Sequence, residues 1–160
     1  MRVLITGGVK SGKSSYALSL ADQNFEHFTY VATAIPFDDE MKQRIAVHRR
    51  ERGDKYRTIE EPVAIHTVVG EDTIVDDITV WMNNLFYKGM EESWKEILEQ
   101  FITNLPQRII VITNETGLGN IPPDRTTRAY NRYLGEANIM LANAMDTVYF
   151  MVAGIPLKVK

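Results

Sequence analysis

The sequence contains no cysteine among its 160 residues. A disulfide scaffold, a zinc-finger site, a thiol nucleophile and a cysteine-ligated iron–sulfur cluster are therefore excluded. Basic residues are not in excess either, because 18 Lys and Arg against 21 Asp and Glu give a net charge of −3. This balance disfavours a globally basic protein that binds nucleic acid. No apolar run approaches the roughly 20 residues of a membrane span, and the start, MRVLITGG, is too short for a signal peptide.

The residues that are present indicate a single globular domain. With 160 residues, 44% of them hydrophobic, the chain is long enough to bury a sizeable core. It has no internal repeat, low-complexity segment or linker, and its most turn-rich stretch, residues 117–123, is too short to divide domains. We expect one domain over residues 1–160, located in the cytoplasm.

Apolar runs alternate with amphipathic stretches along the chain. Strands are predicted at residues 3–5, 28–32, 56–60, 73–75, 108–113, 148–152 and 157–160. Helices are predicted at residues 14–21, 38–52, 94–105 and 124–145. Strands that alternate with helices predict an α/β fold with βαβ units and a mainly parallel sheet.

Residues 7–14 read GGVKSGKS and fit the phosphate-binding pattern G-x-x-x-x-G-K-[ST], or P-loop. The match follows a predicted strand and opens a predicted helix, as the pattern requires. Glycines let backbone N–H groups turn around phosphate oxygens, and the helix N-terminus attracts the same anion. The nucleotide-binding residues predicted here are Gly7, Gly8, Val9, Lys10, Ser11, Gly12, Lys13 and Ser14. A glycine turn before an ordinary helix is the alternative.

Within this loop, Lys13 is expected to act in catalysis by reaching the β- and γ-phosphates, and the Ser14 hydroxyl to bind Mg²⁺. A second acid near the metal is expected at the end of a neighbouring strand. The stretch TIVDD at residues 73–77 supplies Asp76, which directly follows the apolar run, and Asp77 is its rival. The alternative for this acid is a helix cap after a strand.

Missing motifs narrow the class of P-loop protein. The chain has neither the D-x-x-G nor the N-K-x-D pattern of switch-type GTPases, and no LSGGQ-like signature of transporter ATPases. A small-molecule phosphotransferase or nucleotidyltransferase remains.

One histidine stands among four arginines in the predicted helix at residues 38–52. Arg44, His48 and Arg52 are spaced at i, i+4 and i+8 and share a helix face. A histidine in such surroundings can attack a phosphate, because arginine neutralises the oxyanions and disfavours the imidazolium form. The alternative is that His48 borders the core, since Met41 and Ile45 lie on nearly the same face.

Five segments occur together: ITGG-x-x-SGKS, D-D-E-M-x-x-R-I-x-x-H-R, R-T-I-E, D-x-x-T-x-W-x-x-N-L and T-N-E-x-G-x-G-x-x-P. Together they resemble the bifunctional adenosylcobinamide kinase/adenosylcobinamide-phosphate guanylyltransferase family of cobalamin biosynthesis. The resemblance runs from Ile5 to the C-terminal VAGIPLKVK. It implies a P-loop NTPase with a RecA-like, mostly parallel sheet, helices on both faces and assembly as a homotrimer.

The resemblance also implies an activity. Adenosylcobinamide would be phosphorylated with ATP or GTP, and GMP would then pass from GTP to that phosphate through a GMP–histidine intermediate, with Mg²⁺ as cofactor. By motif position the histidine is His48. The further nucleotide-binding positions implied are Ala32, Thr33, Ala34, Arg49, Arg50, Glu51, Arg52, Glu60 and Asp76. A plain P-loop kinase for a small molecule, with His48 structural, is the alternative.

The predicted strands support a shared site. Each of five polar or glycine residues falls at or just past the carboxyl end of a predicted strand: Gly7, Thr33, Glu60, Asp76 and Glu115. Open α/β sheets place their ligands at this edge. The turn Gly117-Leu118-Gly119 is interpreted either as an anion-binding or corrinoid-contacting loop, or as a plain connection.

Overall fold

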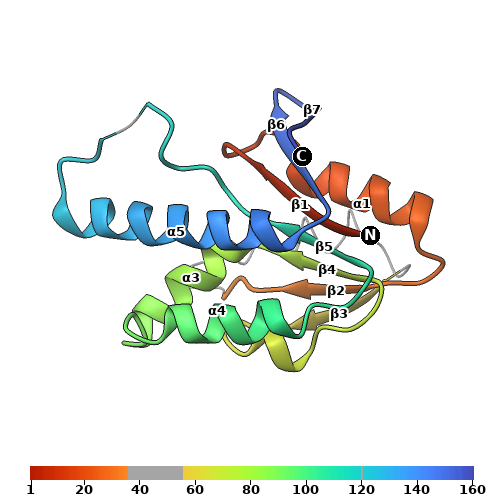
Figure 1. Cartoon of the computed structure of the whole chain (residues 1–160), viewed down its shortest axis with the longest axis horizontal. Coiled ribbons are helices and arrows are strands. Elements are labelled where there is room, and N and C mark those ends of the chain that lie inside the picture. Colours follow the sequence, from red (N-terminus) through yellow and green to blue (C-terminus); the bar gives the residue numbers. More distant parts are fainter. Residues whose placement is uncertain (36–55, 120) are drawn as a thin grey trace.

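The computed structural model describes residues 1–35, 56–119 and 121–160 (Figure 1). The helix predicted at residues 38–52 lies outside the described residues. The same holds for His48 and for the stretch from Arg49 to Arg52.

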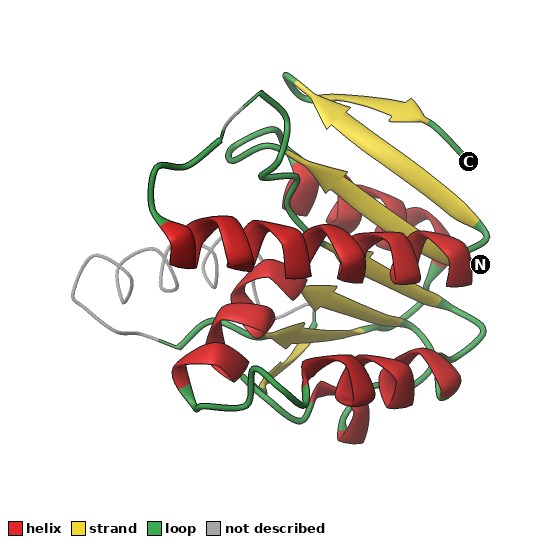
Figure 2. Cartoon of the chain, turned by 60° about the vertical axis from the view of Figure 1, so that its left-hand side comes forward, coloured by secondary structure: helices red, strands yellow, loops and turns green. Residues whose placement is uncertain are grey.

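Seven strands among the described residues form one sheet in the order β3-β2-β4-β5-β1-β6-β7 (Figure 2). Their bounds are β1 (Arg2–Gly7), β2 (Thr29–Ala32), β3 (Arg57–Glu60), β4 (Thr73–Asp76), β5 (Ile109–Ile112), β6 (Thr147–Val152) and β7 (Ile155–Lys158). All neighbours pair in parallel except β6 and β7, which form an antiparallel pair at the edge. The sheet is mostly parallel, as the alternation of elements predicts.

Helices cover both faces of this sheet. In the described part of the chain they are α1 (Lys13–Asn24), α3 (Ile78–Tyr87), α4 (Trp94–Thr103) and α5 (Arg125–Ala144), with a 3₁₀ turn η2 (Ile65–Thr67). α1 lies on one face, and α3, α4 and α5 lie on the other (Figure 2). Alternate residues of each strand therefore enter two separate cores. None of the helices in the described ranges combines the length and hydrophobicity needed to cross a bilayer.

The core explains where the strands form. Val3, Ile5, Ile74 and Ile110 pack toward Ala17 on α1. The next residue along each of these strands points to the other face, into the core that α3, α4 and α5 cover. These residues are Leu4, Val75 and Val111. Strands buried on both faces read as continuous apolar runs, which is why these segments are recognisable in the sequence.

The predicted strands within the described residues are all present, and each end lies within two residues of its predicted position. The last strand is β7, which begins two residues earlier than expected. Helix α3 was not predicted. Its start, Ile78-Thr79-Val80, is β-branched and has low helix propensity, but Trp81 and Leu85 are fully buried in the core. Packing therefore overrides local preference in this segment.

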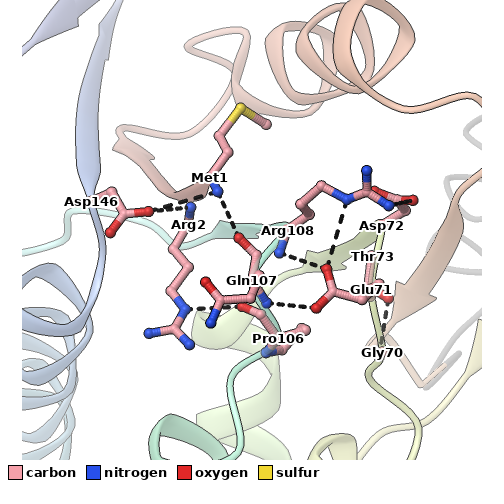
Figure 3. Close-up of polar contacts among 10 residues, drawn as sticks. All are labelled: Met1, Arg2, Gly70, Glu71, Asp72, Thr73, Pro106, Gln107, Arg108 and Asp146. Atoms are coloured by element: carbon pink, nitrogen blue, oxygen red, sulfur yellow. Dashed lines mark hydrogen bonds and ion pairs between the residues drawn. The ribbon is translucent and has the colours of Figure 1, made fainter.

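Polar contacts tie the strands together at their amino ends (Figure 3). The Glu71 carboxylate accepts hydrogen bonds from the backbone N–H groups of Gln107 (2.8 Å) and Arg108 (2.9 Å). The Arg108 guanidinium also pairs with Asp72 at 2.6 Å. These charged side chains bind groups at the amino ends of the strands. They therefore lie at the edge of the sheet opposite the P-loop, which follows the carboxyl end of β1.

Candidate functional site

The P-loop connects the carboxyl end of β1 to the start of α1 (Figure 1). Gly7 has φ +148° and Gly12 has φ +95°, backbone angles that residues with a side chain rarely adopt. A Cβ on Gly7 would lie 2.6 Å from the Met151 carbonyl oxygen. The loop therefore needs glycine at these positions, as its sequence pattern predicts.

Lys13 points back into this loop. Its Nζ donates a hydrogen bond to the Gly8 carbonyl at 2.7 Å, and the residue is 8% exposed. Burial lowers the pKa of Lys13, while the nearby charges of Asp77 and Asp76 act in the opposite direction. The ammonium group thus contacts a loop carbonyl, within the turn that is expected to hold phosphates.

Asp76 and Ser14 meet at the carboxyl edge of the sheet. Ser14, in the first turn of α1, donates its hydroxyl to Asp76 Oδ2 at 3.1 Å, and the Tyr30 hydroxyl donates to the same oxygen. Hydroxyl and carboxylate oxygens are ligands that Mg²⁺ prefers. No group of three or more His, Cys, Asp or Glu side chains forms a metal site within the part of the chain that the structure describes. A Mg²⁺ ion held by Ser14 and Asp76 would therefore take its remaining ligands from nucleotide phosphates and water, as this ion commonly does.

The adjacent acid, Asp77, has other partners. Its Oδ1 accepts from the Thr79 backbone N–H at 2.6 Å, which caps α3, and its Oδ2 accepts from Asn114 Nδ2 at 2.7 Å. Burial, and next the charge of Asp76, raises the pKa of Asp77 to about 7. Of the two rival acids, the structure brings Asp76 to Ser14 and uses Asp77 as a helix cap.

Thr33 fastens the end of β2 to these acids. It is fully buried, and its Oγ1 accepts from the Asp77 backbone N–H at 2.9 Å and donates to the Asp77 carbonyl at 2.8 Å. Its neighbours Ala32 and Ala34 are half-buried. Glu60 lies one strand further out, opposite Ala32 in the register of β2 and β3, and is exposed. The Thr33 side chain thus binds the backbone of Asp77 and is not exposed to solvent.

Asn84 is a site residue to which the sequence analysis gives no role, although it is the asparagine of the segment D-x-x-T-x-W-x-x-N-L. It lies on α3, is 1% exposed, and its Nδ2 donates to the carbonyls of Thr33 (2.8 Å) and Pro62 (2.9 Å). One amide group therefore joins the loops that follow β2 and β3. The available signal is an asparagine within the apolar run WMNNLF, where a buried polar group needs specific partners.

The loop after β5 lies beside the P-loop. The backbone N–H of Glu115 donates to the Gly7 carbonyl at 3.0 Å, and the Glu115 side chain accepts from the Gly117 N–H at 2.6 Å. Leu118 is 72% exposed and the following Gly119 has φ +74°. The P-loop, Thr33, Asp76 and Glu115 thus lie along one edge, as predicted from the strand ends, whereas His48 and the arginines around it lie outside the described residues.

A family model described as cobinamide kinase / cobinamide phosphate guanyltransferase matches residues 3–159. The chain belongs to this family. Membership in the cobinamide kinase/guanyltransferase family confirms the resemblance found in the sequence and makes the protein an enzyme of the transferase class.

Curated relatives span the full length of this family member. The bifunctional adenosylcobalamin biosynthesis protein CobP of Pseudomonas aeruginosa is 38% identical over 169 residues, covering 100% of this chain and 98% of that protein. The bifunctional adenosylcobalamin biosynthesis proteins CobU of Escherichia coli and Salmonella typhimurium are 31% and 32% identical, with full coverage of both chains.

A solved structure supports the fold. An ATPase of a bacterial type III secretion system superimposes with a TM-score of 0.55 at 11% identity, over 98% of this chain and 56% of that chain. The chain therefore spans little more than half of that ATPase, and the likeness concerns the fold alone. It confirms an α/β P-loop NTPase fold for this member of the cobinamide kinase/guanyltransferase family.

Proposed function

We propose that the protein phosphorylates adenosylcobinamide with ATP or GTP and then transfers GMP from GTP to adenosylcobinamide phosphate, giving adenosylcobinamide-GDP. One observation supports this above the others. The P-loop places Lys13 and the Ser14–Asp76 pair together in a chain that matches the kinase/guanyltransferase family over residues 3–159.

In the kinase step, the backbone N–H groups of residues 7–14 and the N-terminus of α1 bind the phosphates of the triphosphate. Lys13 balances their charge, and Ser14 and Asp76 would hold Mg²⁺, which would offset further phosphate charge. The acceptor hydroxyl attacks the γ-phosphorus, the bond to the β–γ bridging oxygen breaks and the nucleoside diphosphate leaves. The hydroxyl proton is released to water. No protein nucleophile is needed.

In the guanylyl step, His48 is the proposed nucleophile. A ring nitrogen of His48 attacks the α-phosphorus of GTP, and the bond to the β-phosphate breaks, so pyrophosphate leaves. A phosphate oxygen of adenosylcobinamide phosphate then attacks the same phosphorus, the P–N bond breaks, and His48 is restored. Further nucleotide contacts proposed for this step come from Ala32, Ala34, Arg49, Arg50, Glu51, Arg52 and Glu60. Thr33, whose side chain is buried, is proposed to support them by holding the backbone of Asp77. The arginines supply charge to the phosphate oxygens.

The proposed assembly is a homotrimer in the cytoplasm. The edge strand β7 supports an assembly, because Ile155 and Leu157 on it are 68% and 56% exposed. Exposed apolar side chains on an unpaired sheet edge are often covered by a partner. Light scattering of the purified protein measures the number of subunits, and a monomer at all concentrations would contradict the trimer.

A labelling experiment tests the nucleophile. Incubated with Mg²⁺ and GTP labelled at the α-phosphate, without corrinoid, the protein should retain about one GMP per site and release pyrophosphate. The bond should be labile in acid and stable in alkali, as for a phosphoramidate. The variant His48→Ala should lose the label but keep nucleotide affinity and part of the kinase step.

The matched control is His27→Ala, because His27 is exposed and belongs to no motif. This variant should retain the label in full. Label that persists in His48→Ala, or that moves to Lys10 or Lys13, would remove His48 from the mechanism and favour a plain P-loop kinase.

A further inference from the structure

Tyr30 reaches the candidate metal ligand from the core of the sheet. It is buried, 2% exposed, in β2, and it packs with Ala17 and Ala21 of α1. In the parallel register it lies opposite Ile74, and Asp76 follows two residues later on the same face of β4. The Tyr30 side chain therefore extends between the sheet and α1 toward the carboxyl edge, where its hydroxyl donates to Asp76 Oδ2.

The same carboxylate oxygen also accepts a hydrogen bond from α1. Ser14 Oγ donates to Asp76 Oδ2 at 3.1 Å from the first turn of α1. Within the described ranges, both hydrogen bonds to the Asp76 carboxylate fall on Oδ2. Oδ1 is then the oxygen left for a metal ion or for one of its waters. Two donors from two different elements thus fix which way the carboxylate faces.

We infer that Tyr30 is a positioning residue that orients Asp76 toward the Mg²⁺ ion of the bound nucleotide. The inference rests on the proposed function, in which Ser14 and Asp76 hold that ion. A phenolic hydroxyl is an uncharged donor, so it restrains the carboxylate without cancelling the charge that attracts the cation. Hydrogen bonds of this kind to a ligating carboxylate orient it and tune its metal affinity.

The variant Tyr30→Phe removes the hydroxyl and leaves the packed ring in place. Fluorescence titration with a non-hydrolysable GTP analogue at increasing MgCl₂ gives the Mg²⁺ concentration at half-maximal binding. We expect this concentration to rise about 10- to 100-fold in Tyr30→Phe. Analogue affinity in EDTA should be unchanged, because the P-loop binds phosphate without this hydroxyl. Binding of Mn²⁺, followed by electron paramagnetic resonance, should weaken by a similar factor.

Tyr56→Phe is the matched control. The Tyr56 hydroxyl also donates to a carboxylate, that of Asp22, at 2.9 Å, but it lies at the amino edge of the sheet. This variant should keep the wild-type Mg²⁺ requirement. If Tyr30→Phe lowers stability but leaves the Mg²⁺ requirement unchanged, its hydroxyl serves only the core and the inference is overturned.

Asp76→Asn separates this inference from the proposed function. If Asp76→Asn raises the Mg²⁺ requirement and Tyr30→Phe does not, the positioning role of Tyr30 falls while the metal site stands. If neither variant changes the Mg²⁺ requirement, Asp76 does not hold the metal, and both the proposed site and the role of Tyr30 are refuted. A shift in both variants, with Tyr30→Phe adding nothing further to Asp76→Asn, supports the inference.

Discussion

The side-chain amide of Asn114 donates a hydrogen bond of 2.7 Å to the Asp77 carboxylate, and this contact distinguishes Asp77 from its neighbour Asp76. Asp77 faces the loop after β5 and the start of α3, whereas Asp76 faces Ser14 on α1. Adjacent carboxylates at the end of β4 therefore have different surroundings. One caps a helix and the other is available to a metal, so substitutions at the two positions should have different effects.

The first prediction compares these acids. Asp76→Asn should reduce Mg²⁺-dependent activity by about 10²-fold or more, because it weakens the hold on the Mg²⁺ ion that stabilises charge on the transferring phosphates. Asp77→Ala should instead lower the free energy of unfolding by about 1 kcal/mol through loss of the α3 cap, and Asp77→Asn should retain most of that stability. Activity against Mg²⁺ concentration and denaturant unfolding measure the two effects. A larger loss of Mg²⁺-dependent activity in Asp77→Asn would reverse the assignment.

The second prediction concerns Lys13. If one P-loop serves both half-reactions, Lys13→Ala should slow phosphorylation and guanylyl transfer alike, by about 10²- to 10³-fold each. Its ammonium group is buried and donates to the Gly8 carbonyl of the same loop, so the charge that is lost lies where the phosphates are expected to bind. Separate assays of the two steps measure the losses. Guanylyl transfer that stays near the wild-type rate would show that a second triphosphate site exists.

Much of this fold can be predicted from the sequence because the signals are local. The buried strands are short β-branched runs, and the P-loop glycines are required by the backbone angles at Gly7 and Gly12. The placement of Asp76 at the end of β4 follows from the apolar run before it. Helix α3 was not predicted because its β-branched start favours an extended chain, whereas burial of Trp81 and Leu85 and the Asp77 cap favour the helix.

The supporting residues of the site have no such local signal. In the sequence, Tyr30 looks like any aromatic residue of the core. Its contact with Asp76 depends on the register of β2 against β4. Asn84 depends in the same way on how α3 lies against two loops. Roles that arise from tertiary register are visible only in the folded chain, whereas ligand-binding turns are visible in the sequence.

The third prediction concerns pH and the amino edge of the sheet (Figure 3). The Asp146 carboxylate accepts from the Arg2 backbone N–H at 2.9 Å, and this bond, with positive charges nearby, lowers the pKa of Asp146. A lowered pKa in the folded state means that folding favours the charged carboxylate. Its contribution is present above the unfolded-chain value, near 4, and is lost as the pH falls through the folded value.

Asp146→Asn should therefore lower the free energy of unfolding at pH 7, by less than about 1 kcal/mol because the carboxylate is largely exposed and screened. The difference from the wild type should shrink as the pH drops below about 4 and also as salt is added. Chemical denaturation between pH 3 and pH 7 measures it. A difference that stays constant over this range would mean that the charge of Asp146 does not contribute.

The last prediction concerns Asn84, whose amide joins the loops after β2 and β3. Asn84→Ala should leave the buried Thr33 carbonyl and the Pro62 carbonyl without this donor, at a cost of about 1–3 kcal/mol in the free energy of unfolding. Because Thr33 also binds the backbone of Asp77, the loosened loop should weaken nucleotide binding under conditions where the variant is fully folded. Asn83→Ala is the matched control on the same helix, since Asn83 is exposed, and it should change neither stability nor affinity. Nucleotide titration and denaturant unfolding of both variants measure the effects. An Asn84→Ala protein with reduced stability but wild-type nucleotide affinity would restrict Asn84 to a role in the core.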